Sequence, residues 1–382
     1  MELVKSTEGH TELLVPKMSL SPVPPSVPVF YNPAASINRS VSVAIVQATE
    51  GTTFCDALAG VGARGVRIAT EVGRELEVMM IDLNPDSINL GRRNARLNGV
   101  SKRCASFHGE ANSFLHSRYG RNEKMDYVDV DPFGTPVPFM QSALSATGDG
   151  GLVSFTATDT AVLCGVHQRV AERRYGGTPL NNHFHHETGI RLLANAIRRE
   201  AGKLDLGIRP VAAHSTRHYI RVFVRVEVGP TKAEAARDYE GYVQWCRQCG
   251  STTKVRSPSP SCGECGRRLK TAGPLWVGKL TEDDTVGRAL AASRALLLPD
   301  AEKILSSQLG VDGFPPWSFS VEGICSAQRR ATVPDAAVAS ALAGQGFKTL
   351  KQPFEKTGLK TDAEYREVAR AVEAAASSAR KA

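Results

Sequence analysis

The stretch TTFCDALAGVGARGVRIATEVGRELEVMMID spans residues 52–82 and decides the fold. Its apolar start, residues 52–58, predicts a short strand that ends in a glycine turn. Residues 63–71 then follow a helical pattern, and residues 76–81 have the composition of a buried second strand. A strand, a turn, a helix and a second strand form one βαβ unit, in which the two strands are parallel.

The same alternation continues on both sides of this unit. We expect further helices over 41–49, 86–97 and 111–119, and further strands over 105–108, 125–130 and 151–156. Strands that alternate with helices predict a parallel sheet with helices on both faces. Because crossovers between parallel strands are right-handed, a doubly wound α/β fold is the main solution.

Residues 209–228 depart from this alternation. Apolar residues recur at every second position from Ile220 to Val228, after a first apolar run at 210–214. This period of two predicts two long antiparallel strands that close the sheet. A dehydrogenase sheet would end in another parallel strand. The pattern therefore favours a Rossmann-like sheet of the kind found in AdoMet-dependent methyltransferases, with an antiparallel last strand.

The bulk composition limits the class of protein. A chain of 382 residues suggests two or three domains. No apolar run approaches the roughly 20 residues that a membrane-spanning helix needs. The polar residues 5–12 argue against a signal peptide. We therefore expect a cytoplasmic protein with no membrane association, and no pattern indicates an obligate protein partner.

The net charge of +8 is compatible with a polyanionic partner but does not establish one. Four of the eight cysteines stand alone in the sequence, which is typical of a reducing compartment and not of a disulfide framework. We read two of these single cysteines, Cys55 and Cys164, as buried structural thiols.

Pro230 marks a predicted domain boundary. Residues 1–229 would form the methyltransferase domain, and residues 230–382 a smaller α/β domain with a zinc site. Within the first domain, the proline-rich residues 21–28 predict an extended N-terminal arm. We expect residues 20–39 to fold over the cofactor pocket.

The glycine turn after the first strand indicates a nucleotide-type ligand. Small residues such as Gly60 let a ligand approach the backbone. Gly62 and Gly65 also fit a dinucleotide pattern, so the loop alone leaves NAD open as an alternative. Asp56, however, would repel a pyrophosphate and attract the cationic methionine end of AdoMet, so AdoMet is favoured.

Further cofactor contacts are predicted at the ends of the next two strands. Asp82 ends the second strand about 20 residues after Gly60, a spacing at which an acid accepts hydrogen bonds from ribose hydroxyls. Glu110 and Ala111 follow the third strand, where an acid can meet the adenine amino group. Arg39 and Arg64 are candidate partners of the AdoMet carboxylate, since arginine pairs with carboxylates in a bidentate way.

The fourth strand ends in Asp131-Pro132-Phe133-Gly134. A purine amino group is a poor nucleophile because its lone pair is delocalised into the ring. A carboxylate that accepts its N–H, helped by the carbonyl of Pro132, draws the lone pair out of conjugation and can act as general base. Phe133 offers a face on which the base can stack. Asp129 is a rival carboxylate, and we favour Asp131 because it adjoins Pro132 and Phe133.

Four cysteines are clustered as Cys246-x-x-Cys249 and Cys262-x-x-Cys265. Two such pairs predict a four-thiolate zinc site, which is structural because four protein ligands close the coordination sphere. Basic residues that suit phosphate contacts surround it; they are Arg247, Lys254, Arg256, Arg267, Arg268 and Lys270.

The combined motifs resemble the tRNA (guanine-26-N2)-dimethyltransferase family over nearly the whole chain. They are Phe30-Tyr31-Asn32-Pro33 with Asn38-Arg39, Asp131-Pro132-Phe133-Gly134, Thr156-Ala157-Thr158-Asp159-Thr160 with Leu163-Cys164-Gly165, Arg174-Tyr175-Gly176-Gly177, His186-Glu187 with Arg191, Gly273-Pro274-Leu275-Trp276, and Lys360-Thr361-Asp362-Ala363.

The resemblance implies that AdoMet is the donor and that N2 of a tRNA guanine is the acceptor, at the hinge between the D arm and the anticodon arm. It also implies that Arg39, Arg64, Asp82, Glu110 and Ala111 touch AdoMet, that Asp131 is catalytic, and that the zinc-bearing domain helps to hold tRNA. The sequence departs from the family pattern at Ser40, where an acid is usual, and at Glu110, where aspartate is usual.

Two alternatives stay open at this stage. The target could be another tRNA guanine or an rRNA amino group, because the pocket motif serves several amino groups. The chain could also be a non-catalytic RNA-binding protein on a methyltransferase scaffold, although the intact Asp56, Asp82 and Asp131 argue against this.

Overall fold

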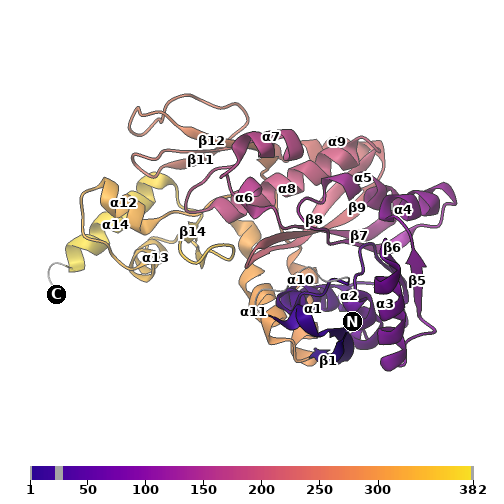
Figure 1. Ribbon diagram of the computed structural model, residues 1–382. Helices are drawn as coiled ribbons and strands as arrows, with labels where there is room; N and C mark the ends of the chain where they lie inside the picture. The colour runs from indigo at the N-terminus through magenta and orange to yellow at the C-terminus, as the bar shows by residue number, and fades with distance from the viewer. Residues whose placement is uncertain (1, 22–28, 380–382) are drawn as a thin grey trace.

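The computed structural model describes residues 2–21 and 29–379, and a seven-stranded mixed sheet lies at its centre (Figure 1). The strand order is β5-β4-β3-β6-β7-β9-β8. The first five strands in this order are parallel, and β9 and β8 form an antiparallel hairpin beside β7. The strands are β3 (Thr53–Asp56), β4 (Glu77–Asp82), β5 (Cys104–His108), β6 (Met125–Val130), β7 (Thr147–Ala157), β8 (Leu206–Thr216) and β9 (Tyr219–Val228). The predicted sheet with an antiparallel last strand is confirmed.

Helices cover both faces of this sheet, as Figure 1 shows. On one face lie α1 (Ser36–Gln47), α2 (Ala63–Glu71) and α3 (Pro85–Leu97). On the other lie α4 (Ala111–Gly120), α5 (Met140–Ala146), α6 (Thr160–Leu163), α7 (Gln168–Tyr175), α8 (His185–Gly202) and α9 (Pro230–Arg237). Each layer buries its apolar side against the sheet in a separate core.

The start of α1 differs from the prediction, which began the helix at residue 41. The helix begins at Ser36 because the 3-10 turn η2 (Pro33–Ala35) leads directly into it. Asn32 caps that turn by accepting a hydrogen bond from the amide of Ala34 at 2.9 Å. The polar residues 38–40 look solvated in the sequence, but they are buried beneath the N-terminal hairpin and the pocket wall.

The N-terminal segment forms a hairpin of β1 (Leu3–Glu8) and β2 (Thr11–Pro16), followed by the 3-10 turn η1 (Lys17–Leu20). Its apolar residues Leu13 and Val15 pack with Tyr31 and with Leu90 of α3. Most of the proline-rich stretch, residues 22–28, lies outside the described residues.

The rest of the chain contains a three-stranded sheet, five helices and a short hairpin among the described residues. The sheet has the order β11-β10-β12. The elements are β10 (Glu240–Trp245), β11 (Thr252–Val255), β12 (Lys270–Trp276), α10 (Asp283–Ala295), α11 (Pro299–Gln308), α12 (Val321–Ala327), α13 (Asp335–Ala343), β13 (Thr349–Lys351), β14 (Leu359–Thr361) and α14 (Tyr365–Ala379), with the 3-10 turn η4 (Val311–Gly313). The 3-10 turn η3 (Val137–Phe139) lies in the first part of the chain, directly before α5.

The domain boundary at residue 229 stays a prediction. The later helices differ in whether they pack on the first part of the chain. The helices α12, α13 and α14 bury their own small core. By contrast, α10 and α11 return to the first part of the chain and pack on α1, in the same apolar core as the sheet (Figure 1). A break in the sequence pattern therefore does not separate all later residues from the first domain in space.

None of the described helices is long and apolar enough to cross a membrane.

The position of β3 determines where the site lies. It is hydrogen-bonded to β4 on one side and to β6 on the other. The chain runs from β3 through β4 to β5 on one side and then continues with β6 and β7 on the other, so the strand order reverses at β3. In open α/β sheets, ligands bind at the carboxyl ends of the strands at such a switch point.

Candidate active site and cysteine cluster

A cavity of about 740 Å³ lies at the carboxyl ends of β3, β4 and β6. Its volume is within the range of small-molecule sites. Every cofactor and catalytic residue predicted from the sequence lines it: Arg39, Asp56, Gly60, Arg64, Asp82, Glu110, Ala111, Asp131, Pro132 and Phe133. The fold thus brings together residues that are spread over nearly one hundred positions of the chain.

The turn after β3 requires its glycines. Gly60 and Gly62 have φ of 53° and 74°, a left-handed conformation that other residues rarely adopt. A side chain at Gly65 would meet Met80 of β4 at 2.8 Å, so this glycine lets α2 pack closely on the sheet. The third glycine of the apparent dinucleotide pattern therefore has a packing role here.

Asp82 is held in the pocket wall by two backbone amides. Its carboxylate accepts from Gly60 at 2.8 Å and from Asn84 at 2.8 Å. These bonds link the end of β4 to the glycine turn and fix the carboxylate at the cavity. This is the arrangement expected of a group that accepts from ribose hydroxyls.

Glu110 has a local role that the sequence analysis did not anticipate. It is the N-cap of α4 and accepts hydrogen bonds from the amides of Asn112 and Ser113, at 3.0 and 2.7 Å. Partial burial opposes its ionisation, but these two backbone bonds outweigh it and lower the pKa of Glu110. The carboxylate still lines the cavity beside the buried Ala111.

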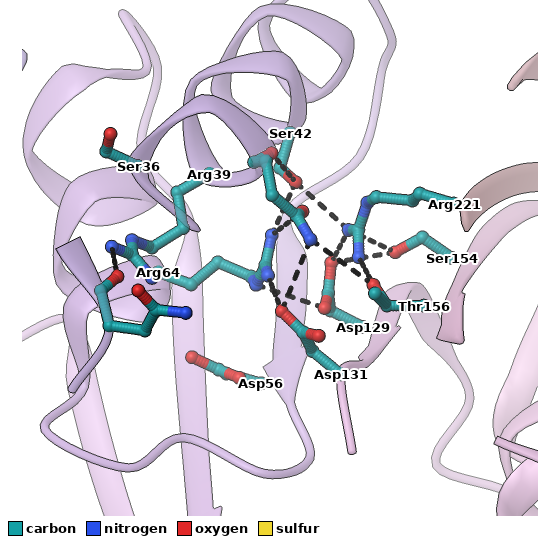
Figure 2. Close-up of polar contacts among 12 residues, drawn as sticks. Ser36, Arg39, Ser42, Asp56, Arg64, Asp129, Asp131, Ser154, Thr156 and Arg221 are labelled. Atoms are coloured by element: carbon teal, nitrogen blue, oxygen red, sulfur yellow. Dashed lines mark hydrogen bonds and ion pairs between the residues drawn. The ribbon is translucent and has the colours of Figure 1, made fainter. Parts of the chain in front are cut away.

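Three carboxyl groups and two guanidinium groups meet beneath the cavity (Figure 2). We call them the Asp131 cluster; its members are Asp56, Arg64, Asp129, Asp131 and Arg221. Arg64 contacts Asp131, and its Nε lies 3.1 Å from Oδ1 of Asp129. Arg221 contacts Asp129 from the other side. All members except Asp131 are almost completely buried.

Hydroxyl and amide side chains from neighbouring elements complete the cluster. Arg64 donates to Ser42 at 2.7 Å and to Asn38 at 3.1 Å, both on α1. Arg221 donates to Thr156 at 2.6 Å and to Ser154 at 2.9 Å, both on β7. Because so many partners hold the two guanidinium groups, the position of Asp131 is fixed before any substrate arrives.

The buried carboxyl groups of the cluster differ in protonation. Burial, opposed by Arg64 and reinforced by the charge of Asp129, raises the pKa of Asp56 to about 7. Burial also opposes ionisation of Asp129, but the guanidinium groups of Arg221 and Arg64 outweigh it and lower the pKa of that group. Of these two acids, Asp129 is the fixed anion and Asp56 carries a proton in mildly acidic solution.

The geometry separates the two rival carboxylates at the end of β6. Asp129 is 2% exposed and is enclosed by arginine and Ser154. The side chain of Asp131 is 24% exposed and lines the cavity. Only Asp131 can therefore reach a molecule bound there, although its catalytic role itself stays a prediction.

Phe133 is 74% exposed, an unusual state for a large aromatic side chain at the mouth of a cavity. Its ring meets that of Phe30 edge to face, with centroids 4.5 Å apart. The turn beneath it is fixed to the end of β7, since Thr158 accepts from the amide of Gly134 at 2.7 Å and donates its own amide to the Gly134 carbonyl at 2.8 Å. The aromatic ring thus stands on a rigid support.

Arg39 and Arg64 were predicted to pair with the AdoMet carboxylate, and both already have acidic partners. Arg39 donates to Glu8 of β1 at 2.8 Å and to the carbonyl of Asn32 at 2.9 Å. Arg64 contacts Asp129 and Asp131. Both line the cavity, so their contact with AdoMet stays a prediction. In the structure, Arg39 links α1 to β1 and to Asn32, and Arg64 holds the carboxyl groups of the Asp131 cluster.

The sequence analysis missed Arg221, and it quoted Asn38 and Phe30 in the family motifs without giving either a role in the site. Arg221 lies in β9 on the face opposite the alternating Ile220 and Val222, and it is completely buried. A charged residue inside a strand flanked by apolar positions was the available signal, because a buried charge needs a partner. No such signal pointed to the role of Phe30, because that role depends on its contact with the ring of Phe133.

The four clustered cysteines converge in space. The four sulfur atoms all lie within 4.8 Å of one another; they belong to Cys246, Cys249, Cys262 and Cys265. The sulfurs of Cys246 and Cys265 are 3.5 Å apart, and those of Cys249 and Cys262 are 3.8 Å apart. Four thiolates at the Zn–S bond length would lie about 3.8 Å from one another in a tetrahedron.

Two equivalent tight turns position these sulfurs. Gly250 donates its amide to the carbonyl of Cys246 at 2.9 Å, and Gly266 donates to Cys262 at 2.8 Å. Both glycines have positive φ, 87° and 69°. The six basic residues predicted around the cluster are all exposed. The loops thus combine a preformed thiol site with a basic surface.

The seven-stranded sheet, its antiparallel last hairpin and the acidic cavity at its switch point define the class of AdoMet-dependent methyltransferases. The family model described as N2,N2-dimethylguanosine tRNA methyltransferase matches residues 9–373. The chain belongs to this family, which confirms the resemblance inferred from its motifs.

Individual relatives agree with the family assignment. The chain is 36% identical to a tRNA (guanine(26)-N(2))-dimethyltransferase of Methanopyrus kandleri, covering 95% of this chain and 94% of that protein. It is 32% identical to the protein of the same description from Methanothermobacter thermautotrophicus, with 94% and 96% covered. Among solved structures, Trm1 from Pyrococcus horikoshii in complex with S-adenosyl-L-methionine has a TM-score of 0.86 and 28% identity, with 97% and 99% covered.

Proposed function

We propose that the protein transfers one or two methyl groups from AdoMet to the exocyclic N2 of guanine 26 in tRNA. The observation that carries this proposal is Asp131, which lines the cavity and is the most exposed carboxyl group of its cluster. The relatives named for this reaction supply the target base. The geometry by itself supports the class of acceptor, which is an amino group on a planar base.

The residues present fit AdoMet. The cavity combines small residues at the turn after β3, the fixed carboxylate of Asp82, and Glu110 with Ala111 at the start of α4. We assign these groups to the ribose and the adenine. AdoMet bound there would supply a methyl group on a positively charged sulfur. The acidic Asp56 and Asp131 favour that charge over a pyrophosphate.

Asp131 activates the guanine amine in this proposal. Its free carboxylate oxygen accepts an N–H of the amine, so the nitrogen lone pair turns toward the methyl group. Arg64 contacts Asp131 and keeps the carboxylate oriented. After transfer the nitrogen is positively charged, and Asp131 takes its proton or passes it to water. The amine then has one N–H left for a second transfer.

Phe133 and Pro132 position the base. The exposed ring of Phe133 offers a stacking surface at the mouth of the cavity. We expect the Pro132 carbonyl to accept the second N–H of the amine. A guanine in a folded tRNA must leave its stack to reach this depth, and the rigid turn at Gly134 provides a fixed place for it.

Beyond the cavity, we propose that Cys246, Cys249, Cys262 and Cys265 hold a structural Zn²⁺ and that the basic surface around them contacts tRNA phosphates. The distances between the sulfurs and the two matching turns support the metal. The exposed arginines and lysines support the phosphate contacts. The cytoplasmic location inferred from the sequence remains a prediction.

The test is incubation with labelled AdoMet and two tRNA transcripts, followed by nucleoside analysis by mass spectrometry. One transcript carries guanine at position 26 and the matched control carries adenine there. We expect N2-methylguanosine and N2,N2-dimethylguanosine from the first transcript and no label in the second. Equal labelling of both would reject position 26, and methylated adenine would reject guanine N2 as the acceptor. Binding without any transfer would favour the non-catalytic alternative.

A further inference from the structure

A second group of metal-binding side chains lies apart from the four clustered cysteines. Cys164 directly follows α6, and His185 and His186 are the first two residues of α8. One ligand atom from each of the three lies within 4.8 Å of the other two. Cys164 is 7% exposed and the histidines are half-buried. The proposed methyl transfer uses none of these residues.

The hydrogen bonds of the two histidines show which nitrogen of each ring is the donor. Nδ1 of His185 lies 2.6 Å from the carbonyl oxygen of Asn182, and Nδ1 of His186 lies 2.6 Å from Oε2 of Glu355. A carbonyl and a carboxylate only accept, so each Nδ1 carries a proton, and Nε2 is the ring nitrogen left to bind a metal. Within residues 2–21 and 29–379, neither Nε2 has a hydrogen-bond partner.

This is the arrangement that metal-binding histidines use. Such a histidine donates its other ring N–H to a carboxylate or a backbone carbonyl, which fixes the tautomer and raises the basicity of the ligating nitrogen. Here His185 has a backbone carbonyl as its partner, and His186 has a carboxylate. Glu355 is itself anchored, because its Oε1 accepts the backbone amide of His186 at 2.7 Å. The ring centroids of the two histidines are only 4.1 Å apart.

We propose that Cys164, His185 and His186 bind a Zn²⁺ ion, with Glu355 as the outer-sphere group that orients His186. One thiolate and two imidazoles suit zinc over magnesium or calcium, which prefer oxygen ligands. Three protein ligands leave one tetrahedral position for water. One possible ligand atom of each residue already lies within 4.8 Å of the other two, so side-chain adjustments can complete the site.

The ion would join the segments of Cys164 and of the two histidines directly, and Glu355 adds a third segment through its hydrogen bond to His186. Cys164 ends the short helix that follows Thr158, the residue bonded to Gly134 of the catalytic turn. His185 and His186 begin the long helix α8. Glu355 comes from the segment between β13 and β14, far along the chain. The metal would therefore fix the wall behind the catalytic turn to the C-terminal part of the protein.

The experiment measures zinc in the full-length protein by mass spectrometry after saturation with Zn²⁺ and removal of free metal. Cys164→Ser should lose one zinc equivalent relative to the unchanged protein. Cys104→Ser, a matched change at a cysteine outside both clusters, should lose none. Cys262→Ser tests the other cluster separately, so the two sites are counted independently. An unchanged zinc content in Cys164→Ser would overturn the proposal.

Two further variants guard against misfolding. His185→Gln alters a half-buried side chain and should also lose one equivalent, with unchanged circular dichroism. Glu355→Gln keeps all three ligands and should weaken zinc binding by about 10- to 100-fold, as measured by competition with a chelator. If His185→Gln and Glu355→Gln both bind zinc as the unchanged protein does, the proposed site does not exist.

Discussion

Two clusters of buried charge in this protein differ in one instructive way. The Asp131 cluster has three carboxyl groups against two guanidinium groups, and one carboxylate opens into a cavity. The second cluster, which we call the Glu187 cluster, consists of Glu187, Arg191, Gln352 and Lys360. All its charged members are at most 4% exposed, and it has no opening.

The Glu187 cluster satisfies its polar groups internally. Glu187 accepts from Arg191, Lys360 and Gln352 at 2.8 to 2.9 Å. Lys360 donates also to the carbonyls of Pro315 and Trp317. This closed arrangement joins α8 to the C-terminal segments. In the Asp131 cluster, by contrast, the side chain of Asp131 is partly exposed and lines a cavity. The comparison teaches that access to a cavity marks the functional cluster, whereas complete enclosure of the charged groups marks the structural one.

The largest effect should come from Asp131. Asp131→Asn keeps the shape and removes the anion, so the amine is no longer activated. We expect kcat for methyl transfer to fall by about 10²- to 10⁴-fold, with AdoMet affinity changed only slightly. Single-turnover transfer and calorimetric AdoMet binding measure the two quantities. Full activity in this variant would exclude the proposed role of Asp131.

The Glu187 cluster should respond in stability and not in chemistry. Glu187→Ala leaves Lys360 buried without its partner, which costs about 3–5 kcal/mol. The matched control is Glu200→Ala on the same helix, because the Glu200–Lys203 pair is at the surface and contributes at most about 1 kcal/mol. Denaturant unfolding monitors both. Equal midpoints for the two variants would contradict the structural role of the cluster.

Asp56 should make stability depend on pH. Its pKa is raised to about 7 in the folded protein from an ordinary value of 3.8, so the folded state holds its proton more tightly than the unfolded chain. The stability that this proton confers is complete below pH 3.8 and is lost as the pH rises to about 7. The loss is on the order of 4 kcal/mol.

Asp56→Asn cannot titrate and should remove this dependence. The measurement is the difference in unfolding free energy between the unchanged protein and the variant, at several pH values from 4 to 8. We expect the unchanged protein to lose stability relative to the variant as the pH rises. A constant difference would mean that Asp56 is ionised throughout the range.

The smallest effect should come from the exposed ring of Phe133. Phe133→Leu removes the stacking surface and leaves Asp131 in place. A stacked base contributes about 1–3 kcal/mol, so KM for tRNA should rise by about tenfold or more with little change in AdoMet affinity. A fall in kcat at saturating tRNA, with KM unchanged, would assign Phe133 to the chemical step instead of base positioning.

The sequence predicted the sheet, its closing hairpin and ten of the residues that line the cavity. These features follow local rules: period-two strands, glycine turns, and acids placed at strand ends. It missed the extent of α1, whose buried polar start looks like a loop. It also missed that Glu110 caps α4, and that Arg221 completes the charged cluster. These depend on neighbours far away in the chain.

The sequence by itself determined the class of fold, the two cysteine pairs and the identity of the acids in the site. Only the tertiary structure decided between Asp129 and Asp131 as the accessible carboxylate, returned α10 and α11 to the first core, and joined Cys164 to His185 and His186. The physical reason is that exposure, pKa and ion pairing depend on which segments surround a side chain. That environment is created when distant parts of the chain pack together, and no local pattern encodes it.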